Sequence, residues 1–305
     1  MIDPGPVDPH VPVLLDAVLA AAGARSRAVD GTLGDGGHSL ALALAGFTVL
    51  GIDRDPGAVA RAATRLAGHP VQIVPGRFDD SLVLEAVGRF HPEFALLDLG
   101  VSSRQLDDDA LGFSFRPGAP LDMRMDRDGQ GAAAWLNEAS VEDLRETFSQ
   151  LADEPKARRL AQEIDRRRAT VPFATSDDLV NAIRGALGRG SGPGDFARLF
   201  QGVRIRVNHE LDRLERALPA FRDALAPGGT LAVISYHSGE DRIVKHLFRE
   251  WARKCVCPPE FPICQCRGRA LGTLVSRRPI LPSPLEVKTN PRARSAKLRL
   301  FRVTG

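Results

Sequence analysis

Residues Asp30–Ala58 read DGTLGDGGHSLALALAGFTVLGIDRDPGA, and this segment decides the fold. Its glycine-rich turn follows a short strand-like run, RAVD at 27–30, and precedes residues 39–45, which begin a helix. A second strand-like run at 47–53 ends in an acid. The order of strand, glycine turn, helix and strand is typical of an open α/β sheet that binds a ligand at the turn.

The same alternation continues along the chain on both sides of a central region. It predicts helices at 56–67, 81–89 and 240–253, and strands at 71–74, 94–100, within 226–235 and at 295–303. Alternating strands and helices indicate a mostly parallel, doubly wound sheet with helices on both faces. We therefore expect an α/β fold of the Rossmann-like kind.

The alternation stops after Gly100. Residues 101–131 are rich in Gly, Pro and Asp, and residues 137–225 show helical spacing without a credible strand. The segment TSDDLVNAIRGAL at 175–187 begins like a capped helix. We expect a discontinuous α/β domain, residues 1–105 and 212–305, with an all-helical insertion domain at 106–211.

Charge is distributed unevenly along the 305 residues, although the net charge is only +3. The first 241 residues contain 26 basic and 35 acidic side chains, whereas the rest contain 15 basic and 3 acidic ones. This asymmetry favours a nucleic-acid surface near the C-terminus over a merely solvated tail. The candidate phosphate contacts are Arg292, Arg294, Lys297 and Arg299.

Composition excludes several classes of protein. Hydrophobic residues make up 43% of the chain, which is enough for a sizeable core. The longest nearly apolar run, 40–52, is shorter than the roughly 20 residues of a membrane span. The first residues, MIDPGPVDPH, lack the features of a signal peptide. We expect a cytoplasmic protein without a membrane partner, and a homodimer is one assembly that the sequence leaves open.

Three ligands compete for the glycine turn. A dinucleotide would place its pyrophosphate beside Asp30 and Asp35, which would repel it, and a P-loop would need Gly-Lys-Ser/Thr where this chain has Gly-His-Ser. S-adenosylmethionine has no phosphate, and its ammonium and sulfonium groups are attracted to carboxylates. Asp53, 19 residues after Gly34, suits the ribose hydroxyls. The turn therefore favours S-adenosylmethionine over a structural turn without a ligand.

The chain resembles the bacterial 16S rRNA (cytosine-N4)-methyltransferase family in segments that run almost from end to end. The similar segments are HVPVLLDAVL (10–19), DGTLGDGGHS (30–39), GIDRDP (51–56), LLDLGVSSRQLDDDALGFSF (96–115), PLDMRMD (120–126), RVNHEL (206–211), PGGTLAVISYHSGEDRIVK (227–245) and NPRARSAKLR (290–299). The motifs LDLGVSS–QLD, LDMRMD and NPRARS are together highly specific.

The resemblance implies a class I methyltransferase domain with an inserted helical domain, S-adenosylmethionine as cofactor, and a cytidine of small-subunit ribosomal RNA as substrate. Two alternatives stay open: a DNA amino-methyltransferase, and an RNA-binding assembly factor that senses the cofactor without transferring methyl. The implied cofactor contacts are Gly36, Gly37, His38, Asp53, Phe78, Asp98 and Gln105.

These positions have both a functional and a structural interpretation. The two adjacent glycines let backbone approach the methionine end, and Asp53 holds the ribose. Phe78 packs on the adenine or belongs to the core, and Asp98 points into the ligand crevice or caps the next turn.

Two residues are candidates for handling the amino proton. Asp122 stands in PLDMRMD, and the alternative for it is a salt bridge with Arg124 or Arg127. His237 stands in SYHSGED, just after a predicted strand, and the alternative for it is a helix cap or an RNA contact.

All four cysteines, Cys255, Cys257, Cys264 and Cys266, lie within the segment KCVCPPEFPICQCRG. Their spacing, C-x-C-x6-C-x-C, places four potential thiolate ligands for a structural zinc ion in twelve residues. The alternative is free or redox-active thiols, since the spacing is not the usual C-x2-C pair and the family needs no metal for methyl transfer.

Overall fold

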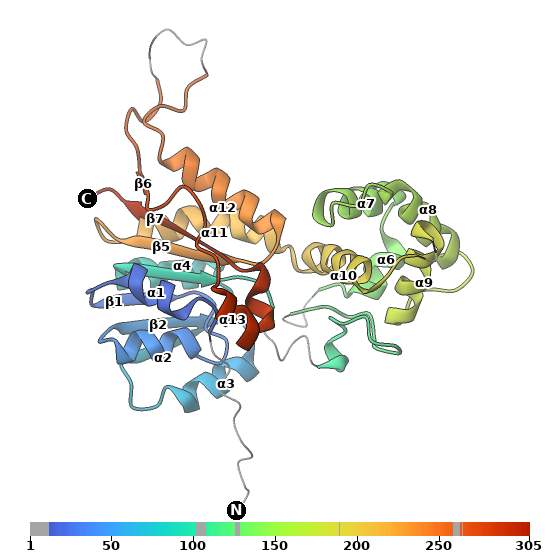
Figure 1. Cartoon of the computed structure of the whole chain (residues 1–305), viewed down its shortest axis with the longest axis horizontal. Helices are drawn as coiled ribbons and strands as arrows, with labels where there is room; N and C mark the ends of the chain where they lie inside the picture. Colours follow the sequence, from blue (N-terminus) through green and yellow to red (C-terminus); the bar gives the residue numbers. More distant parts are fainter. Residues whose placement is uncertain (1–11, 102–107, 126–128, 189, 259–262, 264) are drawn as a thin grey trace, which may run out of the picture. The chain divides into compact units, whose positions relative to one another are not determined.

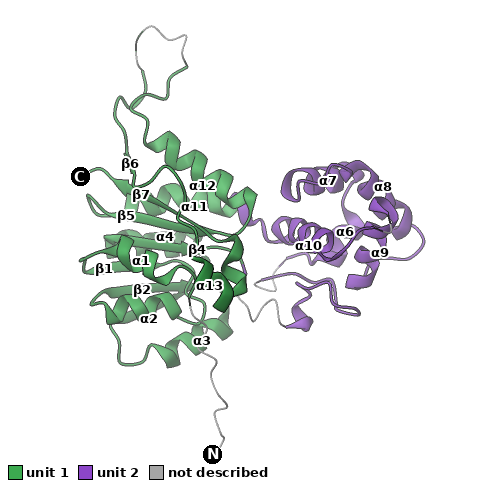
Figure 2. Cartoon of the chain, in the orientation of Figure 1, with its two compact units in different colours: residues 1–100, 213–305 green, residues 101–212 purple. Residues whose placement is uncertain are grey.

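The computed structural model describes residues 12–101, 108–125, 129–188, 190–258, 263 and 265–305. The chain forms two compact units (Figure 2). Unit 1 comprises residues 1–100 and 213–305, and unit 2 comprises residues 101–212. The boundaries expected from the sequence were at 105/106 and 211/212.

Within the described residues, unit 1 contains a seven-stranded sheet with the order β3-β2-β1-β4-β5-β7-β6 (Figure 1). The first five strands in this order are parallel, whereas β7 is antiparallel to both β5 and β6. The strands are β1 (Arg27–Asp30), β2 (Thr48–Asp53), β3 (Val71–Pro75), β4 (Phe94–Asp98), β5 (Thr230–Ser235), β6 (Gly272–Leu274) and β7 (Lys297–Val303). The predicted mostly parallel α/β sheet is confirmed.

The strand order reverses between β1 and β4, which are neighbours in the sheet although two strands separate them in sequence. Val29 pairs with Leu50 of β2 on one side and with Ala95 of β4 on the other. In parallel α/β sheets, ligands bind outside the carboxyl ends of the strands at such a switch point. Asp30 and Asp98 end the two strands that flank it.

Helices cover both faces of the sheet (Figure 1). Successive strand residues point to opposite faces, so each strand contributes to two cores. One core includes Phe221, Phe248 and Phe301, and the other includes Phe47 and Phe94, all at most 2% exposed. The first lies under α4 (Ser81–Phe90), α11 (Glu210–Ala224) and α12 (Ser238–Trp251); the second lies under α1 (Leu15–Ala22), α2 (Gly37–Leu44) and the 3₁₀ helix η3 (Pro291–Ser295).

Some elements of unit 1 have no clear signal in the sequence. Helix α1 begins after Leu14, which has a φ of 55° and no capping side chain, so the usual start signal is missing. The Leu14 N–H instead donates to the Glu286 carboxylate at 2.6 Å, on the short helix α13 (Pro284–Thr289). The helix between β2 and β3, α3 (Pro56–Arg65), does have its signals, since Asp55 caps it and Pro56 occupies the first turn.

The described residues of unit 2 are helical apart from loops and one isolated bridge, between Pro120 and Thr175. Thr175 and Asp178 form the capping box expected at the start of α9. The helices are η1 (Asp109–Leu111), α6 (Ala132–Glu138), α7 (Val141–Glu146), the π-helical η2 (Thr147–Leu151), α8 (Ala157–Arg168), α9 (Ser176–Leu187) and α10 (Pro193–Asn208). Their shared core includes Leu136, Phe148, Leu160, Leu179 and Leu199, each fully buried.

Among the helices of the described residues, none is both long enough and apolar enough to span a membrane.

Candidate active site

Two acids of the glycine turn are engaged within the protein. Asp30 is 1% exposed, and its carboxylate accepts hydrogen bonds from Ser39 Oγ at 2.8 Å and from the Thr32 N–H at 3.2 Å. Asp35 pairs with Arg61 of α3, whose Nε donates at 2.8 Å. Asp30 therefore holds the shape of the turn, and an interaction of these acids with the positive charge of a ligand stays a prediction.

Asp53, at the end of β2, joins that strand to the glycine turn. One carboxylate oxygen accepts from the Gly34 N–H at 2.7 Å, and the other accepts from the Asp55 N–H at 2.9 Å. Burial raises the pKa of Asp53, while these two N–H groups act in the opposite direction. Each oxygen keeps acceptor capacity for a ligand hydroxyl, because a carboxylate oxygen has more than one lone pair.

The protein's own backbone and packing require the two adjacent glycines at the start of α2. Gly36 has a φ of 80°, a left-handed conformation that side chains rarely adopt. A Cβ on Gly37 would lie 2.7 Å from Cγ of Pro12. The backbone and local packing thus explain both glycines, and their contact with a cofactor stays a prediction.

Asp98 lies at the switch point and is held by three other elements. Its Oδ1 accepts from the hydroxyl of Tyr236 at 2.8 Å, and its Oδ2 lies 3.7 Å from Nδ1 of His38. The backbone N–H of Asp98 donates to Thr32 Oγ1 at 2.6 Å. These contacts join β4 to the glycine turn, to the first turn of α2 and to the residue that follows β5.

His38 is buried at the start of α2, where it connects Asp98 to the backbone at Val13. Its Nε2 lies 3.0 Å from the Val13 carbonyl oxygen. A carbonyl only accepts, so Nε2 is the donor in this contact, and Nδ1 faces Asp98.

Burial raises the pKa of Asp98 to about 6, although the nearby His38 and the hydrogen bond from Tyr236 lower it. Burial and the Asp98 charge raise the pKa of Tyr236, so this phenol remains a donor at neutral pH. The Asp98 side chain is still 22% exposed and can reach a bound molecule. A partly exposed carboxylate whose pKa lies near neutral thus stands at the switch point.

Tyr236 and Thr32 were not among the residues expected from the sequence. Tyr236 is the only tyrosine of the chain and directly follows β5, the neighbour of β4. Its position after a predicted strand is the signal from which its contact with Asp98 could have been inferred.

Phe78 is half-buried and packs against the core cluster that contains Val83 and Leu50. This packing matches the core interpretation of Phe78, and its contact with adenine stays a prediction. Gln105 lies outside the described residues, as does Arg127.

His237 is the N-cap of α12. Its Nδ1 accepts from the Glu240 N–H at 3.4 Å, while its own N–H donates to Glu240 Oε2 at 3.3 Å. Its Nε2 is 3.2 Å from Glu240 Oε1 but is not aligned for a hydrogen bond. The helix-cap interpretation is therefore correct, and a role in proton transfer stays a prediction.

Asp122, in unit 2, forms the salt bridge that was the alternative to a catalytic role. Its two oxygens accept from Arg124 Nε at 2.6 Å and from Arg124 Nη2 at 2.9 Å. The salt-bridge interpretation is therefore correct, and a role of Asp122 in proton transfer stays a prediction.

The fold and the site together define a class of protein. An antiparallel β7 inserted between β5 and β6, an acid at the end of β2 that accepts from the glycine turn, and a second acid at the end of β4 are the arrangement of class I S-adenosylmethionine-dependent methyltransferases. The residues present fit that cofactor, because Asp53 offers acceptors for ribose hydroxyls and Asp98 offers negative charge at the switch point.

Comparison with known proteins identifies the family. Residues 8–304 match the model of the MraW methylase family, and the chain belongs to this family. It is 52% identical over 303 residues to ribosomal RNA small subunit methyltransferase H of Gemmatimonas aurantiaca, covering 96% of this chain and 95% of that protein. The protein of the same name from Heliobacterium modesticaldum is 45% identical over 303 residues, with coverages of 95% and 97%. The resemblance stated from the sequence motifs is confirmed.

We predict that Asp98→Asn stabilises the protein without cofactor above about pH 6. An acid with a raised pKa favours folding below its unfolded pKa, and this contribution is lost as pH rises through about 6. The free energy of unfolding of the variant should exceed that of the wild type by about 1–3 kcal/mol at neutral pH, and this excess should disappear near pH 4. Urea unfolding across this pH range measures it.

Glu85→Gln, at an exposed position on α4, is the control and should show no such pH-dependent difference. An Asp98→Asn protein that is less stable than the wild type at neutral pH would contradict a destabilising buried carboxylate.

Proposed function

We propose that this protein transfers a methyl group from S-adenosylmethionine to the N4 amino group of one cytidine in the 16S RNA of the small ribosomal subunit. The observation that carries the proposal is the near full-length identity to proteins named ribosomal RNA small subunit methyltransferase H. The cytoplasm, where ribosomal subunits assemble, is the proposed location. A homodimer stays a prediction.

The cofactor supplies an electrophilic methyl group on a sulfonium. In this proposal Asp53 accepts hydrogen bonds from the ribose, as its position beside the Gly34 N–H allows. His38 and Asp98 lie together at the switch point. The remaining proposed contacts are Gly36, Gly37, Phe78 and Gln105.

The cytosine amino nitrogen is a poor nucleophile, because its lone pair is delocalised into the ring. The protein must orient this group with acceptors, bring it close to the methyl group and exclude water. Because the pKa of Asp98 is about 6, most Asp98 side chains are charged at neutral pH. The charged carboxylate can accept a hydrogen bond from the amino group. The amino nitrogen gains a methyl group and loses one proton, for which Asp122 and His237 are the proposed acceptors.

The proposed RNA surface lies on the basic C-terminal part of unit 1. Three exposed side chains, Lys245, Arg249 and Arg277, line a small cavity beside β7. Basic side chains on one face supply the phosphate contacts that position RNA.

The four basic residues expected to contact phosphate are not equivalent. Arg299 donates to both oxygens of Asp241, at 2.6 and 3.1 Å, and Lys297 Nζ lies 3.7 Å from the same carboxylate. Arg292 and Arg294 are exposed on η3. We therefore assign Arg299 to the protein's own structure and keep the other three as proposed RNA contacts.

The test of this function is transfer of labelled methyl to small ribosomal subunits from a strain that lacks the protein, followed by nucleoside analysis. We expect N4-methylcytidine at one site, lost in Asp98→Ala. Label in duplex DNA but not in subunits would favour the DNA amino-methyltransferase. Cofactor binding without transfer to any of duplex DNA, naked RNA or subunits would favour the sensing factor.

We predict that Asp122→Asn lowers the transfer rate by about 10²–10⁴-fold if Asp122 accepts the amino proton. Single-turnover transfer at saturating cofactor measures the rate, and cofactor affinity should not change. Glu142→Gln is the matched control, because Glu142 forms a comparable pair with Arg145 in the same unit. An unchanged rate with bound cofactor would remove Asp122 as a base.

We predict that RNA binding falls steeply with salt, and that Lys245→Ala with Arg249→Ala reduces the slope of log K against log salt by about 2. Filter binding to ribosomal RNA at several salt concentrations measures the slope. Arg89→Ala, an exposed change on α4, should leave it unchanged. A flat profile for the wild type would contradict an electrostatic RNA surface.

A further inference from the structure

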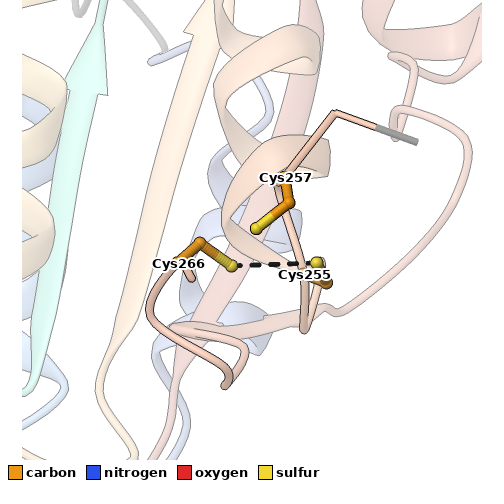
Figure 3. A group of neighbouring side chains, drawn as sticks. All are labelled: Cys255, Cys257 and Cys266. Carbon is orange, nitrogen blue, oxygen red and sulfur yellow. Dashed lines mark hydrogen bonds between the residues drawn. The ribbon is translucent and has the colours of Figure 1, made fainter. Parts of the chain in front are cut away.

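Three cysteines converge on the loop that joins α12 to β6. Cys255 and Cys257 follow the helix, and Cys266 returns from the other side of the loop (Figure 3). Their sulfur atoms all lie within 4.8 Å of one another, and none of the three forms a disulfide. Cys264, the fourth candidate ligand in the sequence, lies outside the described residues.

The distance between the sulfur atoms of Cys255 and Cys266 is 3.8 Å. A disulfide would require about 2.05 Å. Two thiolates on a tetrahedral zinc ion, each about 2.3 Å from the metal, are separated by about 3.8 Å. The observed separation is therefore that of two ligands on one edge of a zinc coordination tetrahedron.

Backbone donors also point at the sulfur atoms. The Val256 N–H donates to Sγ of Cys266 at 3.3 Å, and the Gln265 N–H donates to Sγ of Cys257 at 3.3 Å. The two bonds run in opposite directions across the loop and hold its two sides together. Hydrogen bonds to sulfur orient it, as outer groups do around metal ligands.

The base of this loop is held by contacts that do not involve the cysteines. Arg267 donates from Nη2 to the Glu250 carbonyl at 2.5 Å and from Nη1 to the Glu250 carboxylate at 3.2 Å, at the end of α12. The Leu271 N–H donates to the Trp251 carbonyl at 2.8 Å. Loss of the cysteines should therefore affect this loop rather than the fold of unit 1.

Charge near the cluster suits a metal bound by thiolates. A divalent ion with three thiolates has a net charge of −1, and the exposed side chains of Arg253, Lys254 and Arg269 lie in the same loop. Thiolates select zinc over harder cations such as magnesium and calcium. Three protein ligands leave one position of the tetrahedron for a fourth donor.

We propose that Cys255, Cys257 and Cys266 bind one zinc ion, which joins the two sides of this loop and takes no part in methyl transfer. No bond other than metal–sulfur coordination forms, and each thiol releases its proton on binding.

The test measures zinc in the full-length protein, purified under reducing conditions without chelator. We expect about one zinc per chain in the wild type and less than about 0.2 in Cys255→Ser and Cys266→Ser. Val256→Ala is the matched control, because it keeps the backbone N–H that donates to Cys266, and it should retain the metal.

A second measurement uses cobalt(II) added to the reduced, metal-free protein. Tetrahedral thiolate coordination should give sulfur-to-cobalt charge-transfer absorption, and zinc should displace it. The proposal would be overturned if the wild-type protein holds less than about 0.2 zinc per chain after reconstitution. It would also be overturned if the cysteine variants bind as much metal as the wild type. The proposal would also be overturned if Cys255 and Cys266 form a disulfide and the protein still binds no zinc once this bond has been reduced. Thermal unfolding of each variant checks that it is folded, and neither metal readout depends on methyl transfer.

Discussion

Burial of a carboxyl group at the end of β4 is the constraint around which the active site is arranged. Desolvation of Asp98 costs free energy, and the molecule offsets only part of this cost with the Tyr236 hydroxyl and the nearby His38 ring. These partners come from different elements, and Thr32 of the glycine turn fixes the backbone at the same point. The switch point of the sheet thus carries a partly exposed carboxylate whose charge is only partly compensated, which suits a cationic cofactor.

The acids near the glycine turn have different roles, which their number alone does not reveal. Asp30 uses its acceptors on Ser39 and Thr32, so it shapes the turn. Asp53 shares its acceptors between the turn and its own loop and keeps capacity for hydroxyl groups. The acids at the ends of β2 and β4, rather than Asp30, are therefore the ones that keep capacity for a ligand.

Local patterns in the sequence were sufficient to predict the parallel sheet, the glycine turn and the positions of Asp53 and Asp98. Each depends on hydrophobic alternation or on the end of a strand, which neighbouring residues determine. Contacts between distant segments were not predictable in this way. The link between Leu14 and Glu286 joins residues 272 positions apart, and the Tyr236 hydroxyl reaches Asp98 across 138 positions. Such contacts exist only once the sheet has assembled, so α1, α13 and the role of Tyr236 were missed.

The order of the strands also determines when the protein can fold during its own synthesis. A nascent chain that ends at residue 212 contains all of unit 2 but lacks β5, β6 and β7. Its β4 then has an unpaired edge, since β5 and later β7 complete that side of the sheet. Helix α13, whose Glu286 accepts from Leu14, is made after β5 and β6. The sheet of unit 1 can therefore be completed only after β7 has been made, whereas the helical unit can fold earlier.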